Sequence, residues 1–213
     1  MVRIKICGIT RKKDALYAVK LGVDALGFVF APSPRKIHPD TALGIIQVLP
    51  PFVQTVGVFM DEDPSKVRAV MARCGLDIVQ FHGKESPQMC KEFMPRVIKA
   101  FSIASSEDLE AILPYKGKVR AVILDSSSGS KGGGSGNTFD WTLACKAKRM
   151  GIPIILAGGI NPSNVEKAIG LVRPFGVDVS SGVERGFGEK DPFLLQKFVT
   201  RVRRSEDETS LLE

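Results

Sequence analysis

Short apolar runs alternate with longer amphipathic stretches along the whole chain. The apolar runs begin near residues 2, 24, 54, 77, 96, 119, 153 and 176, and each stretch between them is long enough for one helix. A strand buried in a parallel sheet is apolar on both faces, and the helix that follows it returns the chain to the same end of the sheet. The pattern therefore predicts repeated strand–helix units and a parallel sheet rather than a β-sandwich.

The number of predicted strands indicates a closed barrel, because eight parallel strands with intervening helices form a (β/α)8 TIM barrel. An open, doubly wound sheet is the competing fold, but it usually has fewer strands and a Gly-rich fingerprint after the first. The first apolar run here ends in Cys7-Gly8-Ile9-Thr10, which matches neither GxGxxG nor GxxxxGK[ST]. We therefore predict an α/β chain with a single-domain, phosphate-binding (β/α)8 barrel over residues 1–204 and a frayed acidic tail over residues 205–213.

The last two predicted strands each end in a loop of small residues. The first loop contains Gly158 and Gly159, and the second contains Ser180 and Ser181. One such loop alone is more typical of a tight turn. In a (β/α)8 barrel, however, the last two loops frequently share a phosphate site, in which uncrowded backbone N–H groups face the anion. We expect these residues to bind a phosphorylated substrate, with Asn161 capping a helix that opens at Pro162.

A Gly- and Ser-rich segment, residues 126–137, follows the sixth predicted strand. Its composition suits a flexible linker between domains. Its position favours the sixth strand-to-helix loop instead, at the end of the barrel where catalytic loops gather.

Composition narrows the function classes. The chain has 213 residues, 44% of them hydrophobic, and a net charge of +7 that is scattered along the sequence without interleaved aromatic residues. This distribution favours a solvated surface over nucleic-acid binding. The four cysteines form no CxxC pair and no apolar run reaches membrane length, so we expect a cytoplasmic protein without a zinc site or a membrane span.

Four polar residues follow predicted strands, at the end of a barrel where catalytic groups lie. They are Cys7, Arg35, His82 and Asp125. Each residue also has an alternative, purely structural interpretation: Cys7 as a small buried thiol, Arg35 as a surface arginine, His82 as a core histidine and Asp125 as a turn-forming aspartate.

Strand alternation places Lys5 and Cys7 on one face of the first strand and Asp178 on one face of the last, its neighbour in a closed barrel. We expect Lys5 and Asp178 to form a mainly structural pair, and Lys5 is a candidate to favour a Cys7 thiolate. Cys74, Cys90 and Cys145 are expected to be small buried hydrophobes.

Several motifs together resemble the phosphoribosylanthranilate isomerase family, in the family's order and over essentially the whole chain. They are KICGIT, GFVFAPSPRK, VQFHG, LD followed by GGSGNTFDW, LAGGINPSNV and GVDVSSGVE. The resemblance implies a TIM barrel that converts N-(5-phosphoribosyl)anthranilate to 1-(2-carboxyphenylamino)-1-deoxyribulose 5-phosphate, an Amadori rearrangement in tryptophan biosynthesis, without a cofactor or a metal.

The resemblance also implies residue roles. Cys7 matches the family's general base, Asp125 its general acid, and Arg35 the arginine set against the anthranilate carboxylate. The last two loops would bind the phosphate, Gly133 and Gly134 would close over it, and His82 would line the site. The expected partner is the small-molecule substrate, with the chain a monomer or a homodimer.

Two rival functions stay open. Another sugar-phosphate barrel isomerase would perform the same rearrangement on an aminoaldose with paired aspartates, although a carboxylate would then be expected where Cys7 stands. A non-catalytic protein that binds a phospholigand or RNA would use the positive charge and show affinity that falls steeply with salt.

Overall fold

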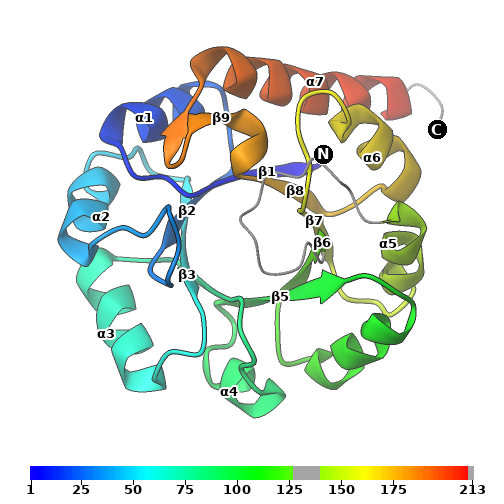
Figure 1. Cartoon of the computed structure of the whole chain (residues 1–213), viewed down its shortest axis with the longest axis horizontal. Coiled ribbons are helices and arrows are strands. Elements are labelled where there is room, and N and C mark those ends of the chain that lie inside the picture. Colours follow the sequence, from blue (N-terminus) through cyan, green and yellow to red (C-terminus); the bar gives the residue numbers. More distant parts are fainter. Residues whose placement is uncertain (127–139, 211–213) are drawn as a thin grey trace.

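The structure, a computed structural model, describes residues 1–126 and 140–210, with side chains described through residue 205. Its centre is a closed barrel of parallel strands in the order of the sequence, with β8 paired to β1 (Figure 1). The strands are β1 (Arg3–Cys7), β2 (Ala25–Val29), β3 (Gln54–Phe59), β4 (Ile78–Phe81), β5 (Val97–Ile103), β6 (Ala121–Ser126), β7 (Ile154–Leu156) and β8 (Gly176–Val179). The predicted (β/α)8 barrel is confirmed, and each strand begins within a few residues of its predicted start.

A ring of helices surrounds the barrel (Figure 1). They are α1 (Lys12–Lys20), α2 (Pro39–Ile46), α3 (Pro64–Cys74), α4 (Pro87–Glu92), α5 (Trp141–Lys148), α6 (Val165–Val172), α7 (Pro192–Ser210) and the 3₁₀ helix η1 (Glu107–Tyr115), which follows β5. Capping residues stabilise the start of three helices. Asp63, Ser86 and Asp140 precede α3, α4 and α5, and their side chains accept hydrogen bonds from backbone N–H groups of the first turn.

One helix boundary differs from the sequence-based expectation. Helix α6 begins at Val165 rather than at Pro162, because the Asn161 side chain accepts bonds from Ser163 and stabilises a separate turn before the helix. Helix α7 extends to Ser210, and the division of the chain into a barrel over residues 1–204 and a tail over residues 205–213 stays a prediction. Fraying of the acidic tail stays a prediction.

The apolar core has two main parts. The larger packs the helices onto the outer face of the strands, and the smaller fills the barrel interior with Val56, Ile98, Ala100, Ala121, Ile123 and Ala157. Among the described residues, no helix is long and apolar enough to cross a membrane.

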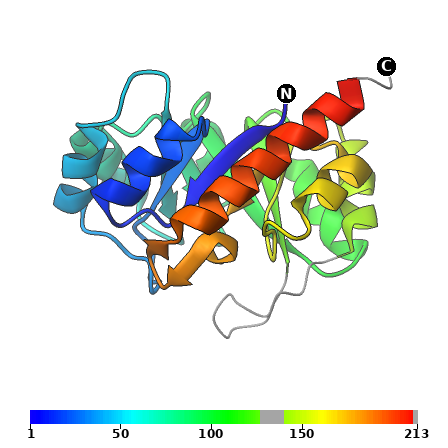
Figure 2. The same ribbon diagram turned by 90° about the horizontal axis from the view of Figure 1, so that it is seen from above.

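A short antiparallel hairpin follows β8. It consists of β9 (Glu184–Gly186) and β10 (Glu189–Lys190), and it leads into α7. Figure 2 shows this hairpin at one end of the barrel and the N-terminus at the other. The hairpin therefore lies at the carboxyl ends of the strands, where the candidate residues gather.

Candidate active site

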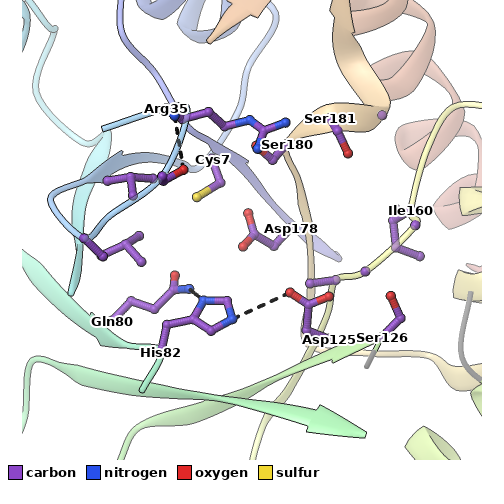
Figure 3. A pocket seen from close by; sticks show the side chains of 18 of the residues that line it. Cys7, Arg35, Gln80, His82, Asp125, Ser126, Ile160, Asp178, Ser180 and Ser181 are labelled. Atoms are coloured by element: carbon purple, nitrogen blue, oxygen red, sulfur yellow. Dashed lines mark hydrogen bonds and ion pairs between the residues drawn. The ribbon is translucent and has the colours of Figure 1, made fainter. Parts of the chain in front are cut away.

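A cavity of about 410 Å³ opens at the carboxyl ends of the strands (Figure 3). All the described residues that the sequence singled out as site residues line it: Cys7, Arg35, His82, Asp125, Gly158, Gly159, Ser180 and Ser181. Gly133 and Gly134 lie outside the described residues, so their closure over the site stays a prediction. The barrel thus brings together groups that are scattered over the sequence.

Cys7 ends β1, and its thiol points into the cavity (Figure 3). The predicted pair beneath it is present: Lys5 Nζ lies 2.7 Å from Asp178 Oδ2, and both side chains are buried. Burial raises the pKa of the Cys7 thiol above its usual value, and the opposing positive charge of Lys5 is too weak to reverse that shift. Lys5 therefore favours the thiolate as expected, but burial outweighs it, so Cys7 is a thiol at neutral pH in the free protein.

Asp125, near the end of β6, is a carboxyl group that protonates readily. Burial, and next the negative charge of Asp178, raise the pKa of Asp125 from 3.8 to about 6. A carboxyl group with a pKa near the working pH is suited to general acid catalysis.

His82 follows β4 and faces Asp125, with its Nε2 3.7 Å from Asp125 Oδ2 (Figure 3). Burial, and next the positive charges of Lys5 and Lys99, lower the pKa of His82, so the ring is neutral at neutral pH. Gln80 Nε2 lies 3.4 Å from His82 Nδ1. With Gln80 donating, the neutral ring carries its proton on Nε2, toward the Asp125 carboxyl.

The two Gly/Ser loops, residues 157–161 after β7 and residues 180–182 after β8, lie against each other. A Cβ at Gly182 would clash with the carbonyl oxygen of Ile160, so only glycine permits this approach. Gly158 has a φ of 63°, and a Cβ there would lie 2.5 Å from Asp125 Oδ1. The first loop therefore runs directly past the candidate acid, with its backbone at the cavity wall.

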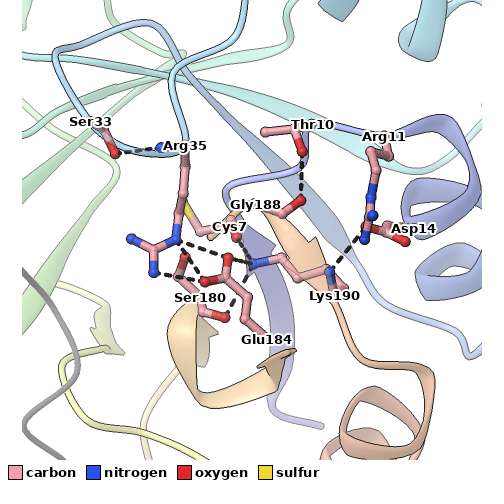
Figure 4. A network of polar contacts seen from close by, with 10 residues as sticks. All are labelled: Cys7, Thr10, Arg11, Asp14, Ser33, Arg35, Ser180, Glu184, Gly188 and Lys190. Carbon is pink, nitrogen blue, oxygen red and sulfur yellow. Dashed lines mark hydrogen bonds and ion pairs between the residues drawn. The ribbon is translucent and has the colours of Figure 1, made fainter. Parts of the chain in front are cut away.

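Arg35 reaches the cavity from the loop after β2, and Glu184 binds its guanidinium (Figure 4). Arg35 Nε lies 2.9 Å from Glu184 Oε1, and Arg35 Nη2 lies 2.7 Å from Glu184 Oε2. The guanidinium carbon also lies 5.4 Å from the centre of the Phe187 ring. Arg35 is thus held in one orientation rather than being a mobile surface residue.

Sequence reasoning missed Lys190, and it gave Glu184 no role. Lys190 is fully buried, and its Nζ donates to the carbonyl oxygens of Cys7 and Ser180 and to Glu184 Oε1 at 2.6, 3.1 and 2.8 Å (Figure 4). A lysine in a polar, Gly-rich segment is typical of an exposed turn. Only the return of the hairpin over β1 brings it to Cys7.

Two buried polar atoms at the cavity have no hydrogen-bond partner within the part of the chain that the structure describes. They are Asp178 Oδ1 and Gln80 Oε1. A buried acceptor without a partner is destabilising, and such atoms occur where a ligand supplies the missing donor.

The fold and the cavity place this chain among the phosphate-binding (β/α)8 barrels. The sequence profile of one family, N-(5'phosphoribosyl)anthranilate (PRA) isomerase, matches residues 4–201. The chain therefore belongs to the N-(5'-phosphoribosyl)anthranilate isomerase family, as its motifs indicated.

Individual relatives agree with this membership. The N-(5'-phosphoribosyl)anthranilate isomerase of Desulforudis audaxviator is 51% identical over 207 residues, which cover 96% of this chain and 100% of the relative. The crystal structure of the Thermotoga maritima phosphoribosyl anthranilate isomerase has a TM-score of 0.89 and 44% identity, with 96% of this chain and 100% of that chain covered. A structure of such an isomerase with reduced 1-(o-carboxyphenylamino)-1-deoxyribulose 5-phosphate has a TM-score of 0.86 and 42% identity, at the same coverage.

Proposed function

We propose that this protein is a phosphoribosylanthranilate isomerase, which converts N-(5-phosphoribosyl)anthranilate to 1-(2-carboxyphenylamino)-1-deoxyribulose 5-phosphate in tryptophan biosynthesis. The observation that carries the proposal is one cavity containing a carboxyl group with a pKa of about 6, a thiol on the first strand, and two Gly/Ser loops. Family membership supplies the substrate.

The reaction needs one acid and one base. Asp125 donates its proton to the ribose ring oxygen, the bond from that oxygen to C1 breaks, and the anthranilate nitrogen becomes part of a protonated Schiff base. Cys7, as a thiolate, then takes the proton from C2, and the electron pair of the C–H bond forms the C1–C2 double bond of an enolamine. A proton then adds to C1 while the C2 hydroxyl group loses its proton, which gives the C2 ketone, so two protons are gained, two are lost, and the atoms of substrate and product balance.

Three parts of the cavity match three parts of this substrate. The Gly/Ser loops provide N–H groups for the phosphate. Val29, Ala31 and Val58 form an apolar patch beside Cys7 that suits the anthranilate ring. Arg35 would bind the ring carboxylate through a charged, directional contact, and Asp178 Oδ1 would accept a bond from a ribose hydroxyl.

The test is the decay of phosphoribosylanthranilate fluorescence with purified protein in EDTA, compared among wild type, Cys7→Ala and Asp125→Asn. General acid or base assistance typically contributes about 10²- to 10⁴-fold, so each variant should lose at least about 100-fold in kcat. Cys145→Ala, outside the cavity, is the matched control and should retain full activity.

Other outcomes would change the assignment. A loss of less than about tenfold in a folded variant would remove that residue from the acid–base pair. No decay with folded wild type would contradict the proposal, and isomerisation of an aminoaldose phosphate would then be tested. Salt-sensitive RNA binding without turnover would favour the non-catalytic alternative.

We also propose that the chain forms a homodimer through the amino-terminal end of the barrel, because the Thermotoga maritima isomerase is dimeric. Phe52 there is 98% exposed and borders a second cavity of about 690 Å³, which Phe175 and Pro95 also line. An exposed aromatic side chain beside a cavity that other apolar side chains partly line is typical of an association site.

Sedimentation velocity tests the dimer. Wild type should sediment as a dimer and Phe52→Asp as a monomer, while Phe193→Asp, at an exposed position on α7, should leave the dimer intact. A monomeric wild type would contradict the proposal. The cytoplasmic location expected from the sequence stays a prediction.

A further inference from the structure

The Arg35 guanidinium has two edges on which a carboxylate can bind through two hydrogen bonds. Glu184 occupies the edge formed by Nε and Nη2, with bonds of 2.9, 3.0 and 2.7 Å. Within residues 1–126 and 140–205, the hydrogen bonds of the Arg35 side chain all go to Glu184, so the edge formed by Nη1 and Nη2 stays available. Glu184 therefore determines which edge of Arg35 can receive a second carboxylate.

Lys190 holds Glu184 in place. Its Nζ has three acceptors, the carbonyl oxygens of Cys7 and Ser180 and the Glu184 carboxylate. A charged ammonium group has three N–H donors and a neutral amine only two, so this geometry fits the charged form. The Glu184 side chain is 5% exposed, and it is therefore fixed between two cations by bonds that water scarcely reaches.

The charges of these residues do not cancel. Arg35 and Glu184 alone would form a neutral pair with little attraction for another anion. Lys190 adds a second positive charge, so the cluster retains a net positive charge beside the cavity. The cluster is thus both oriented and charged to bind a carboxylate.

We propose that Glu184 and Lys190 are positioning residues. Glu184 fixes the orientation of Arg35, Lys190 holds Glu184 and gives the cluster its net positive charge, and together they give the enzyme its preference for a substrate whose aromatic ring carries a carboxylate. This inference rests on the proposed function. Glu184 acts through Arg35 and has no direct contact with the substrate. Lys190 also ties the hairpin to the backbone of Cys7 and Ser180, so its replacement is expected to affect turnover more broadly.

The experiment compares two substrates, N-(5-phosphoribosyl)anthranilate and N-(5-phosphoribosyl)aniline, which lacks the ring carboxylate. Product formation is followed chromatographically for wild type, Arg35→Gln and Glu184→Gln. Glu184→Gln should lower kcat/KM for the anthranilate substrate about tenfold, mainly through KM, because a neutral amide accepts weaker hydrogen bonds from Arg35 than the carboxylate does and holds the guanidinium less firmly in its orientation. For the aniline substrate, kcat/KM should change less than about twofold.

Glu189→Gln is the matched control. Glu189 lies in the same hairpin, pairs with Arg11 and Arg185 on the surface, and is 45% exposed. This variant should leave kcat/KM for both substrates unchanged. Calorimetric titration with reduced 1-(o-carboxyphenylamino)-1-deoxyribulose 5-phosphate gives a second measurement that needs no turnover, and Glu184→Gln should weaken this binding about tenfold as well.

The possible failures are distinguishable. An equal loss on both substrates in Glu184→Gln would mean a merely structural role and would overturn the inference. If Arg35→Gln shows no selective loss, Arg35 does not bind the carboxylate, and the inference fails with that assignment. If wild type converts neither substrate, the proposed function itself is wrong.

Discussion

Replacing Asp125 by asparagine should inactivate the enzyme and at the same time stabilise its fold at neutral pH. Burial and the charge of Asp178 raise the pKa of Asp125 from 3.8 to about 6. Each pKa unit corresponds to about 1.4 kcal/mol, so holding the ionised carboxylate in the folded protein costs about 3 kcal/mol. The Asp125 side chain is 29% exposed and keeps some hydration, which reduces the expected gain to about 2–3 kcal/mol.

The free-energy cost of ionising Asp125 in the folded protein depends on pH. Below pH 3.8 the carboxyl group is neutral in both the folded and the unfolded state, so it imposes no cost. Between pH 3.8 and about 6 the unfolded state ionises first, and above about pH 6 the folded protein carries the full cost. Asparagine is neutral at every pH and has nearly the same shape, so the variant escapes the cost.

Urea unfolding of wild type and Asp125→Asn at pH 4 and pH 8 measures the effect. The variant should be more stable by about 2–3 kcal/mol at pH 8, and by only about 0.5 kcal/mol at pH 4. For a chain of this size the gain at pH 8 corresponds to about 4–12 °C in Tm. If the two proteins show the same pH dependence of stability, the pKa of Asp125 is not raised and the reasoning fails.

Asp24→Asn is the control with the opposite sign. Asp24 pairs with Arg3 and Arg203. Although burial acts to raise the pKa of Asp24, bonds from the Ile4 backbone and both arginines outweigh burial and lower it. The ionised carboxylate of Asp24 therefore stabilises the folded protein at pH values above its usual pKa. This stabilisation is lost as the pH falls through the lowered pKa of Asp24 in the folded protein, so Asp24→Asn should destabilise the protein at pH 8.

Three further predictions follow from the same cavity. Turnover needs Asp125 protonated and Cys7 ionised in the same molecule, so kcat/KM should rise with pH up to about 6, while the thiolate fraction grows and Asp125 stays protonated. Above about pH 6 the loss of the Asp125 proton offsets the further gain in thiolate, so kcat/KM should level off and fall only above the raised pKa of Cys7. A decline that begins at pH 6 would contradict this pair. Lys5→Met should cost about 3–5 kcal/mol in urea unfolding, because it leaves Asp178 buried without its cation, and Lys5→Met/Asp178→Asn should recover much of that loss. Gly158→Ala, at a φ of 63° against Asp125, should raise KM and lower stability by at least about 1 kcal/mol, and an unchanged KM would count against contact of this loop with the phosphate.

The barrel was predictable because its signal is local. Each strand is a short apolar run, each helix is amphipathic, and caps such as Asp63 and Ser86 mark helix starts in the sequence itself. The strand-end residues were predictable for the same reason, since parallel strands place their carboxyl ends together.

The rest of the site depends on contacts between distant segments. Lys190 bonds to the backbone of Cys7, 183 residues away, and no local pattern marks a lysine for burial. The orientation of Arg35 was missed with it, because that orientation is set by Glu184. The effect of Lys5 on Cys7 was visible in the strand alternation, whereas the burial that outweighs Lys5 and keeps Cys7 a thiol was not. Asn161 was misassigned because its local turn competes with the helix.

The distribution of charge around the cavity explains why these buried groups occur together. Lys5 and Asp178 cancel, so the centre of the site, beside the thiol and a mostly neutral Asp125 at pH below about 6, carries little net charge. The cluster of Arg35, Glu184 and Lys190 is positive on one side, and under the proposed function the backbone N–H groups of the two Gly/Ser loops would provide a second anion-binding region. A substrate with an anionic group at each end and its reacting carbons between them fits this pattern. The aniline substrate keeps the phosphate but loses the carboxylate, and for that reason it separates the contribution of Arg35 and Glu184 to carboxylate binding from the contribution of phosphate binding.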